Sequence, residues 1–234
     1  DYVLAPERFA ERKAFTYREV ETVRKLWAGN STASLNGANE VIEVNIFPRP
    51  LQPELPIWLG CRYVEMFEKA GALGARALAA LLNMNVDQLA ERISIYRDTW
   101  VKHGYALSEA HVALMLHTYL GDDIQAVKEK ARRPFYEYIR SYVELAAPLA
   151  SSFKIDADRL SDADKEAFLA FVYERYFNMS SLIGTTKTCL PFVGKLKEIG
   201  VDEIACLIDF GLDSDSVLKG LDNLVELKRL AEGE

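Results

Sequence analysis

Apolar and polar residues along this chain follow two rhythms, one typical of amphipathic helices and one of buried strands. Apolar residues three or four positions apart predict helices, and the expected ranges are 6–27, a helix ending at Gly71, 86–103, 122–148, 162–177, a helix closed by Gly200, and 213–230. Short and nearly continuous apolar runs predict buried strands at 57–60, 76–82, 111–120 and 204–210.

The clearest of these runs is Ile204–Phe210, which lies between two predicted helices. Such a run suits a parallel strand that is buried on both faces. Asp209 lies near its carboxyl end, which is where open sheets and barrels place their sites. The alanines and leucines of 76–82 leave helix as an alternative there, and Pro134 is expected to break or kink the helix at 122–148.

Two further segments have a clear local character. Residues 31–47 are expected to form a β-hairpin, because polar and apolar residues alternate there and Asn36-Gly37 is a turn signal. The following PRPLQPELP has four prolines in nine residues and is expected to be an extended connector.

Four buried strands that alternate with helices predict right-handed crossovers and a parallel sheet. Four strands are half of a (β/α)8 barrel, whose usual length is about 250 residues. The hairpin and an excursion at 121–183 use many residues, so the other half does not fit here. The fold class expected for the single domain, residues 1–234, is therefore α/β, an incomplete barrel.

Composition narrows the choice of partners and compartment. The 234 residues have a formal net charge of −7 and no Lys/Arg-rich run, which argues against nucleic acid and against an anionic membrane surface. No apolar run reaches the roughly 18 residues of a membrane span. Cys61, Cys189 and Cys206 are far apart and favour a reducing compartment, so the cytoplasm is expected. The opening DYVLAPERF is expected to lie inside a longer protein.

Several blocks of sequence resemble one family of enzymes. In order along the chain they are DYVLAPERFAERK, NIFPRPLQPELPIWL, HVALMLHTYLGDD, ERYFNMSSLIGTTKTC and IGVDEIACLIDFGLD. They are similar to the C-terminal two-thirds of bacterial-luciferase-like flavin monooxygenases, and most similar to the subgroup associated with polyketide and nonribosomal peptide synthesis. The resemblance implies that the four strands are the fifth to eighth of a TIM barrel.

The resemblance also implies a chemistry. Reduced FMN would be the co-substrate, supplied by a separate flavin reductase, and O2 the oxidant. The substrate would be a natural-product intermediate, either a small molecule or one bound to a carrier protein, and a homo-oligomer is possible. Residues 149–183, within the excursion, would act as a lid over the site.

The family holds the flavin phosphate in the loop that here reads Gly60, Cys61, Arg62 and Tyr63. Backbone N–H groups at a helix start, together with a guanidinium, suit a phosphate. This loop is about one residue short and lacks the small and hydroxyl-bearing residues usual in the family. Arg62 is either a replacement donor or a solvated surface residue.

Three residues are candidate catalytic groups. His117 comes late in its strand and either orients a substrate or is a hydrogen-bonded core residue. Asp209 either contacts substrate or flavin, or caps the next helix, for which Asp213 is better placed. Tyr176 either faces the barrel mouth or belongs to a helix core. No metal is expected, because no histidines or carboxylates have metal-ligand spacing.

Two other functions remain open. One is a non-catalytic luciferase-like subunit that supports a partner, which the altered loop at 60–63 favours. The other is a different phosphate-binding barrel enzyme, which the polar residues late in the strands allow.

Overall fold

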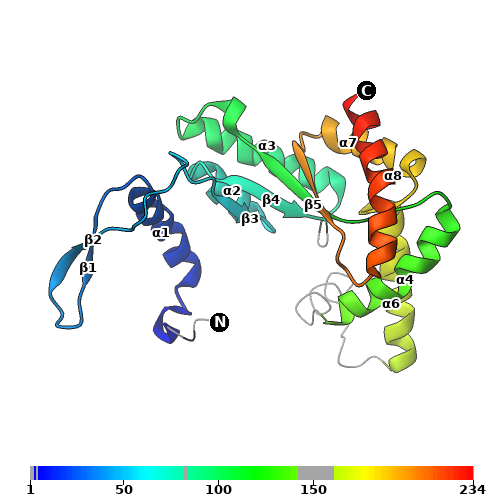
Figure 1. Cartoon of the computed structure of the whole chain (residues 1–234), viewed down its shortest axis with the longest axis horizontal. Helices are drawn as coiled ribbons and strands as arrows, with labels where there is room; N and C mark the ends of the chain where they lie inside the picture. The colour runs from blue at the N-terminus through cyan, green and yellow to red at the C-terminus, as the bar shows by residue number, and fades with distance from the viewer. Residues whose placement is uncertain (1–2, 4, 82–83, 142–160, 234) are drawn as a thin grey trace.

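The centre of the molecule is a parallel sheet with β5 in its middle (Figure 1). The computed structural model describes residue 3 and residues 5–81, 84–141 and 161–233. Its main strands are β3 (Trp58–Gly60), β4 (Arg76–Ala80), β5 (Val112–Leu120) and β7 (Glu203–Leu207). Neighbouring strands pair in parallel in the order β3, β4, β5, β7. The four predicted strands and their parallel arrangement are therefore confirmed, including strand rather than helix for β4.

Helices connect the strands at the predicted places. They are α1 (Arg12–Trp27), α2 (Val64–Ala72), α3 (Val86–Lys102), α4 (Ile124–Ser141), α6 (Asp162–Met179), α7 (Thr186–Glu198) and α8 (Ser214–Glu232). Short 3-10 turns occupy Pro6–Arg8 and Leu107–Glu109. Capping boxes begin α3, α6 and α7, at Asn85, Ser161 and Thr185. Each box satisfies N–H groups that a helix start otherwise leaves without an acceptor.

One face of the sheet carries the main core. Alternate strand residues such as Ala77, Ala79, Leu114 and Leu116 are buried against apolar residues of α2, α3, α7 and α8. The residues between them face the other way, and Leu78, in the middle of β4, is 37% exposed. Among the described residues the sheet does not close into a barrel, and this second face is left partly exposed.

The N-terminal part projects from this body (Figure 1). It consists of α1 and the predicted hairpin, β1 (Thr32–Leu35) paired with β2 (Val41–Val44). The proline-rich connector that follows has no helix, as expected. Arg24 of α1 donates to the carbonyl oxygens of Leu73 and Gly74, at 2.6 and 3.0 Å, and so ties α1 to the turn after α2.

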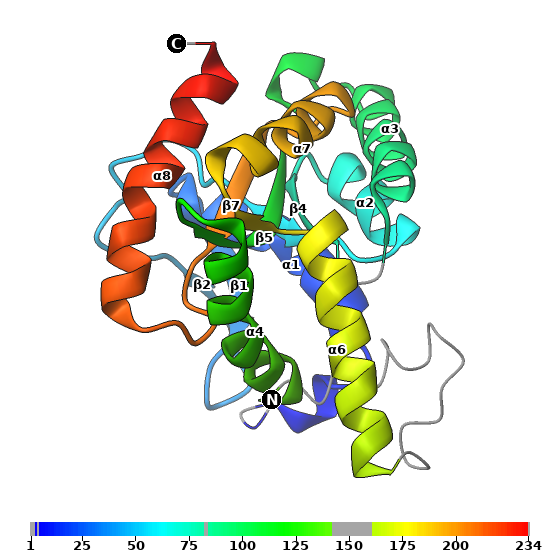
Figure 2. The ribbon, with the colours of Figure 1, turned by 90° about the vertical axis from the view of Figure 1, so that its right-hand side faces the viewer.

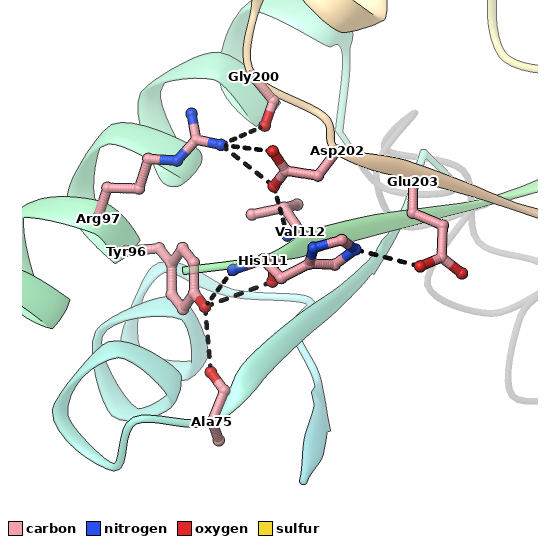
Figure 3. Close-up of polar contacts among 8 residues, drawn as sticks. All are labelled: Ala75, Tyr96, Arg97, His111, Val112, Gly200, Asp202 and Glu203. Carbon is pink, nitrogen blue, oxygen red and sulfur yellow. Dashed lines mark hydrogen bonds and ion pairs between the residues drawn. The ribbon is translucent and has the colours of Figure 1, made fainter. Parts of the chain in front are cut away.

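A polar network fixes α3 to the amino-terminal ends of the strands (Figure 3). Arg97 donates to the Gly200 carbonyl oxygen at 2.9 Å and to both carboxylate oxygens of Asp202 at 3.1 Å. The same carboxylate accepts the Val112 N–H at 2.8 Å, while the Asp202 N–H donates to the Val112 carbonyl oxygen. Asp202 therefore sets the start of the β5–β7 pairing.

Other contacts extend this network (Figure 3). The Tyr96 hydroxyl accepts the His111 N–H at 3.2 Å and lies 3.3 Å from the carbonyl oxygens of Ala75 and His111. His111 Nε2 lies 3.1 Å from a Glu203 carboxylate oxygen. The network contains His111 but lies at the end of the sheet opposite to the carboxyl ends, so it is a structural clamp.

The structure differs from the sequence expectations in three places. An additional three-residue strand, β6 (Leu182–Gly184), pairs with the last three residues of β5. The strand expected at 204–210 ends at Leu207, which pairs with His117, so Asp209 lies in the following loop. Pro134 lies inside α4 and does not break it, and Val127, Ala131, Phe135 and Ile139 bury one stripe of that helix on both sides of the proline.

Two expectations concern the lid and membrane spans. Of the lid expected at 149–183, residues 149–160 lie outside the described residues, while Ser161 caps α6, which occupies Asp162–Met179. No helix in the described part of the chain is long and apolar enough to cross a membrane.

Candidate functional site

A second apolar cluster lies over the carboxyl-terminal end of β5, formed mainly by α4 and α6 (Figure 2). The stripe of α4 at Val127, Ala131, Phe135 and Ile139 packs against buried residues of α6. These residues of α6 are Leu169, Val172, Tyr173 and Tyr176. Phe210, from the loop after β7, completes the cluster. The excursion between β5 and β6 therefore covers the end of the sheet at which α/β proteins build their sites.

His117 lies inside this cluster, enclosed by four aromatic rings. Its ring centroid is 4.7 Å from that of Tyr138 and 5.3–5.4 Å from those of Phe135, Tyr176 and Phe210. All four rings meet the imidazole at steep angles of 72–81°. The side chain has no exposed surface. An edge-to-face arrangement of this kind is favourable for packing but offers the imidazole no strong hydrogen-bond partner.

The polar atoms of this cage are not satisfied by the protein. In the part of the chain that the structure describes, neither ring nitrogen of His117 has a hydrogen-bond partner. The hydroxyl of Tyr176 has none there either. Burial lowers the pKa of His117 to about 4, although the nearby Asp209 carboxylate acts in the opposite direction. Burial also raises the pKa of Tyr176, with a further contribution from Tyr138. Both groups are therefore neutral at pH 7.

A cleft lies on the outer side of the cage. Its volume is about 480 Å³, and it is lined by Arg133, Pro134, Glu137, Tyr138, Asp209, Phe210 and Gly211. Tyr138 and Phe210 belong both to the cleft and to the cage around His117. Asp209 is exposed at its edge. Asp213, not Asp209, caps α8 by accepting the Ser216 N–H at 2.9 Å, so capping does not explain Asp209.

The loop at 60–63 lies on the same end of the sheet, two strands away from β5. Gly60 pairs with Leu78 of β4, and an added Cβ at Gly60 would meet nothing within 4 Å. Tyr63 begins α2 without a side-chain cap, so the first N–H groups of this helix point at the loop. Arg92 of α3 holds the loop by donating to the Arg62 carbonyl oxygen at 2.8 Å.

Cys61 and the backbone of this loop are partly committed to other contacts. The Cys61 thiol is buried, lies 3.3 Å from the Leu59 carbonyl oxygen, and has its pKa raised by burial to about 12. The Cys61 N–H donates to the Leu78 carbonyl oxygen at 2.7 Å and so extends the β3–β4 ladder. The Arg62 N–H is directed at the Met66 sulfur at 3.4 Å. Cys61 thus turns its thiol to the interior, and the uncapped N–H groups in this region are those in the first turn of α2.

The structure brings together His117, Tyr176 and Asp209, the three residues singled out as candidate catalytic groups. It keeps Gly60–Tyr63 as a separate loop at the same end of the sheet. The sequence interpretation missed Phe135, Tyr138 and Phe210, which form the rest of the cage. For Phe135 the spacing of four residues from Ala131 and Ile139 was an available signal. In the described residues, no group of three or more His, Cys, Asp or Glu side chains could hold a metal ion.

Comparison with known proteins places this arrangement in a family. The family model described as luciferase-like monooxygenase matches residues 6–203, which include β3, β4, β5 and β6 and end at the first residue of β7. The chain belongs to the luciferase-like monooxygenase family. The luciferase-like relationship expected from the sequence blocks is therefore confirmed, and so is the luciferase-like α/β fold in a partial form.

Solved structures agree on the fold. The monooxygenase RslO1 from Streptomyces bottropensis superposes with a TM-score of 0.64 at 17% identity, covering 94% of this chain and 64% of that one. The coenzyme F420-dependent tetrahydromethanopterin reductase from Methanopyrus kandleri gives a TM-score of 0.66 at 16% identity, covering 90% and 62%. The oxygenating constituent of 3,6-diketocamphane monooxygenase from Pseudomonas putida, in complex with FMN, gives 0.64 at 13% identity, covering 95% and 65%.

This luciferase-like chain spans about three fifths of the length of these solved relatives. No curated protein matches its sequence. The relatives bind two kinds of cofactor, since one is described with FMN and another as dependent on F420.

The residues present fit the phosphate end of such a cofactor. Gly60 leaves open space, the first N–H groups of α2 have no side-chain cap, and the Arg62 guanidinium lies in the same loop. Glu65, in the first turn of α2, repels an anion. The helix dipole and the Arg62 guanidinium both attract an anion and outweigh this single negative charge.

Proposed function

We propose that this chain is part of a flavin-dependent monooxygenase that uses reduced FMN and O2. The observation that carries the proposal is the uncapped start of α2 beside the open Gly60, at the carboxyl end of β3, in a member of the luciferase-like monooxygenase family. Reduced FMN, when bound, would supply the electrons and the reaction with O2. The protein would supply binding, orientation and a dry environment.

Each part of the site has a role in this proposal. The N–H groups at the start of α2 and the Arg62 guanidinium would hold the phosphate. Arg92 keeps the loop in place through its bond to the Arg62 carbonyl oxygen. The cage around His117 would exclude water and present neutral hydrogen-bonding groups toward the substrate, with Asp209 at the edge of the adjoining cleft.

The finer parts of the proposal rest on the sequence blocks. The substrate would be a natural-product intermediate, free or bound to a carrier protein, and reduced FMN would come from a separate reductase. A cytoplasmic location is consistent with the cysteine usage. These parts are supported by the resemblance to the polyketide- and peptide-associated subgroup.

A second candidate is a non-catalytic subunit that supports a partner. The loop favours it, because the Cys61 and Arg62 N–H groups are already used within the protein and only the first turn of α2 offers uncapped N–H groups. Fluorescence titration of the chain with FMN and with F420 separates the candidates. Saturable FMN binding supports the monooxygenase, tighter F420 binding indicates a reductase-type member, and no binding of either indicates the supporting subunit.

The Arg62→Ala variant should bind FMN roughly ten- to a hundredfold more weakly than the unmodified chain, while riboflavin affinity changes little. The physical reason is that a charge-assisted hydrogen bond contributes about 1.5–3 kcal/mol and riboflavin has no phosphate to accept it. Flavin fluorescence gives both affinities. Arg229→Ala, an exposed arginine in the last turn of α8, is the matched control and should alter neither. An equal loss for both flavins would show that Arg62 does not contact the phosphate.

A further inference from the structure

The cage around His117 combines complete burial with unsatisfied polar atoms. His117 has no exposed surface and Tyr176 only 5%. Both imidazole nitrogens and the Tyr176 hydroxyl lack a partner among the described residues. Buried polar atoms of this kind lower stability unless something bonds to them, and apolar side chains of the same shape avoid that loss. The unsatisfied atoms therefore point to a bound group that completes them.

The hydrogen-bonding capacity of these atoms defines the group. A neutral imidazole offers one N–H donor and one acceptor nitrogen, and the tyrosine hydroxyl can do either. The complement is a group that donates and accepts at once, such as a hydroxyl. A charged group is excluded, because the same burial that keeps His117 neutral would penalise any ion, and an anion would also meet the Asp209 carboxylate.

The cleft provides the space for such a compound beside the cage. Tyr138 and Phe210 separate its volume of about 480 Å³ from the imidazole. Gly211, next to Phe210, has a φ of +106°, which is a backbone conformation that favours glycine. Small-molecule sites commonly have volumes of about 300–1,000 Å³ and aromatic walls. A ring compound in this cleft lies against Tyr138 and Phe210, and its polar substituent reaches His117 when one of these two rings turns aside.

We propose that this cleft binds an uncharged hydroxyl-bearing aromatic compound, whose hydroxyl forms hydrogen bonds with His117 and Tyr176. The proposal deepens the proposed function, since it gives the substrate class of the same site. Its test needs no flavin, so its outcome is independent of whether FMN binds.

The experiment uses 2-naphthol and its methyl ether, 2-methoxynaphthalene, as probes, and measures their affinities for the chain by isothermal titration calorimetry. The naphthol should bind about tenfold more tightly, because the ether lacks the donor. Equal affinities, or no binding of the naphthol, would overturn the proposal. Tighter binding of 2-naphthoate than of 2-naphthol would overturn it as well, because it would indicate an anion site.

Two tyrosines on α6 provide a matched pair of variants. The Tyr173 hydroxyl donates to the Lys128 carbonyl oxygen, whereas the hydroxyl of Tyr176 has no partner. Tyr176→Phe should reduce naphthol affinity about tenfold and leave the melting temperature unchanged or higher. Tyr173→Phe should lower the melting temperature and leave the affinity unchanged. If Tyr176→Phe leaves the affinity unchanged, the hydroxyl is structural and the proposal fails.

His117→Phe tests the other residue proposed to bond the hydroxyl of the compound. It replaces two unsatisfied nitrogens with an apolar ring, so the melting temperature should rise while the preference for naphthol over its ether disappears. A variant that keeps the preference would exclude His117 from the site. Should this variant not fold, the two tyrosine variants still decide.

Discussion

Gly71→Ala should destabilise the chain by about 3 kcal/mol, because α2 and α3 touch at this glycine. An added Cβ at Gly71 would lie 2.5 Å from the Tyr96 carbonyl oxygen and 3.0 Å from the Thr99 Cβ and from the Trp100 backbone nitrogen. Two of these atoms are backbone atoms of a neighbouring helix, so no side-chain rotation relieves the clash. The helices must separate, which loosens the core around Phe67.

The same substitution at Gly194 is a matched control. Gly194 lies inside α7, is exposed, and has nothing within 4 Å of an added Cβ. Gly194→Ala should therefore stabilise by about 0.5–1 kcal/mol, since alanine favours the helix and nothing opposes it. Urea unfolding followed by circular dichroism gives both values. Similar values for the two variants would mean that α2 and α3 do not pack as described.

Asp202→Ala should cost about 2–3 kcal/mol, because one carboxylate serves both Arg97 and the Val112 N–H (Figure 3). Val112 is fully buried, so its N–H cannot turn to water when the acceptor is removed. Asp202→Asn should cost less, since an amide oxygen can still accept the Val112 N–H.

Glu203→Gln provides the contrast within the same network. Glu203 contacts His111, but its side chain is 55% exposed, and exposed ion pairs contribute little. Its effect on unfolding free energy should stay within about 0.5 kcal/mol. Comparable losses for Asp202→Ala and Glu203→Gln would contradict the assignment of Asp202 as the residue that sets the β5–β7 pairing.

Gly71→Ala and Asp202→Ala both affect the part of the fold that the sequence predicted well. The strands β3, β4, β5 and β7 are recognisable because each is a short apolar run bounded by turn residues or helix starts. β6 escaped prediction, and it forms where the end of β5 offers edge hydrogen bonds. The end of β7 was placed too late for a related reason, since apolar character continues beyond the last paired residue, Leu207.

The site was predictable only in part. His117, Asp209 and Tyr176 could each be proposed from their place near a predicted strand or helix end. Their meeting depends on how α4 and α6 pack over β5, which no local pattern encodes. The orientation of Cys61 is a similar case, because the thiol direction follows from the ladder bond between its N–H and the Leu78 carbonyl oxygen.

The central claim is that the start of α2 holds the phosphate of FMN, and backbone amide NMR tests it most directly. The N–H groups of Val64 and Glu65, in the first turn of α2, have no acceptor within the helix and are free to bond a phosphate. Addition of FMN should shift both amide resonances, whereas riboflavin should leave them in place. If FMN binds and these two resonances do not move, or if riboflavin moves them equally, the phosphate is not held at α2 and the account is wrong.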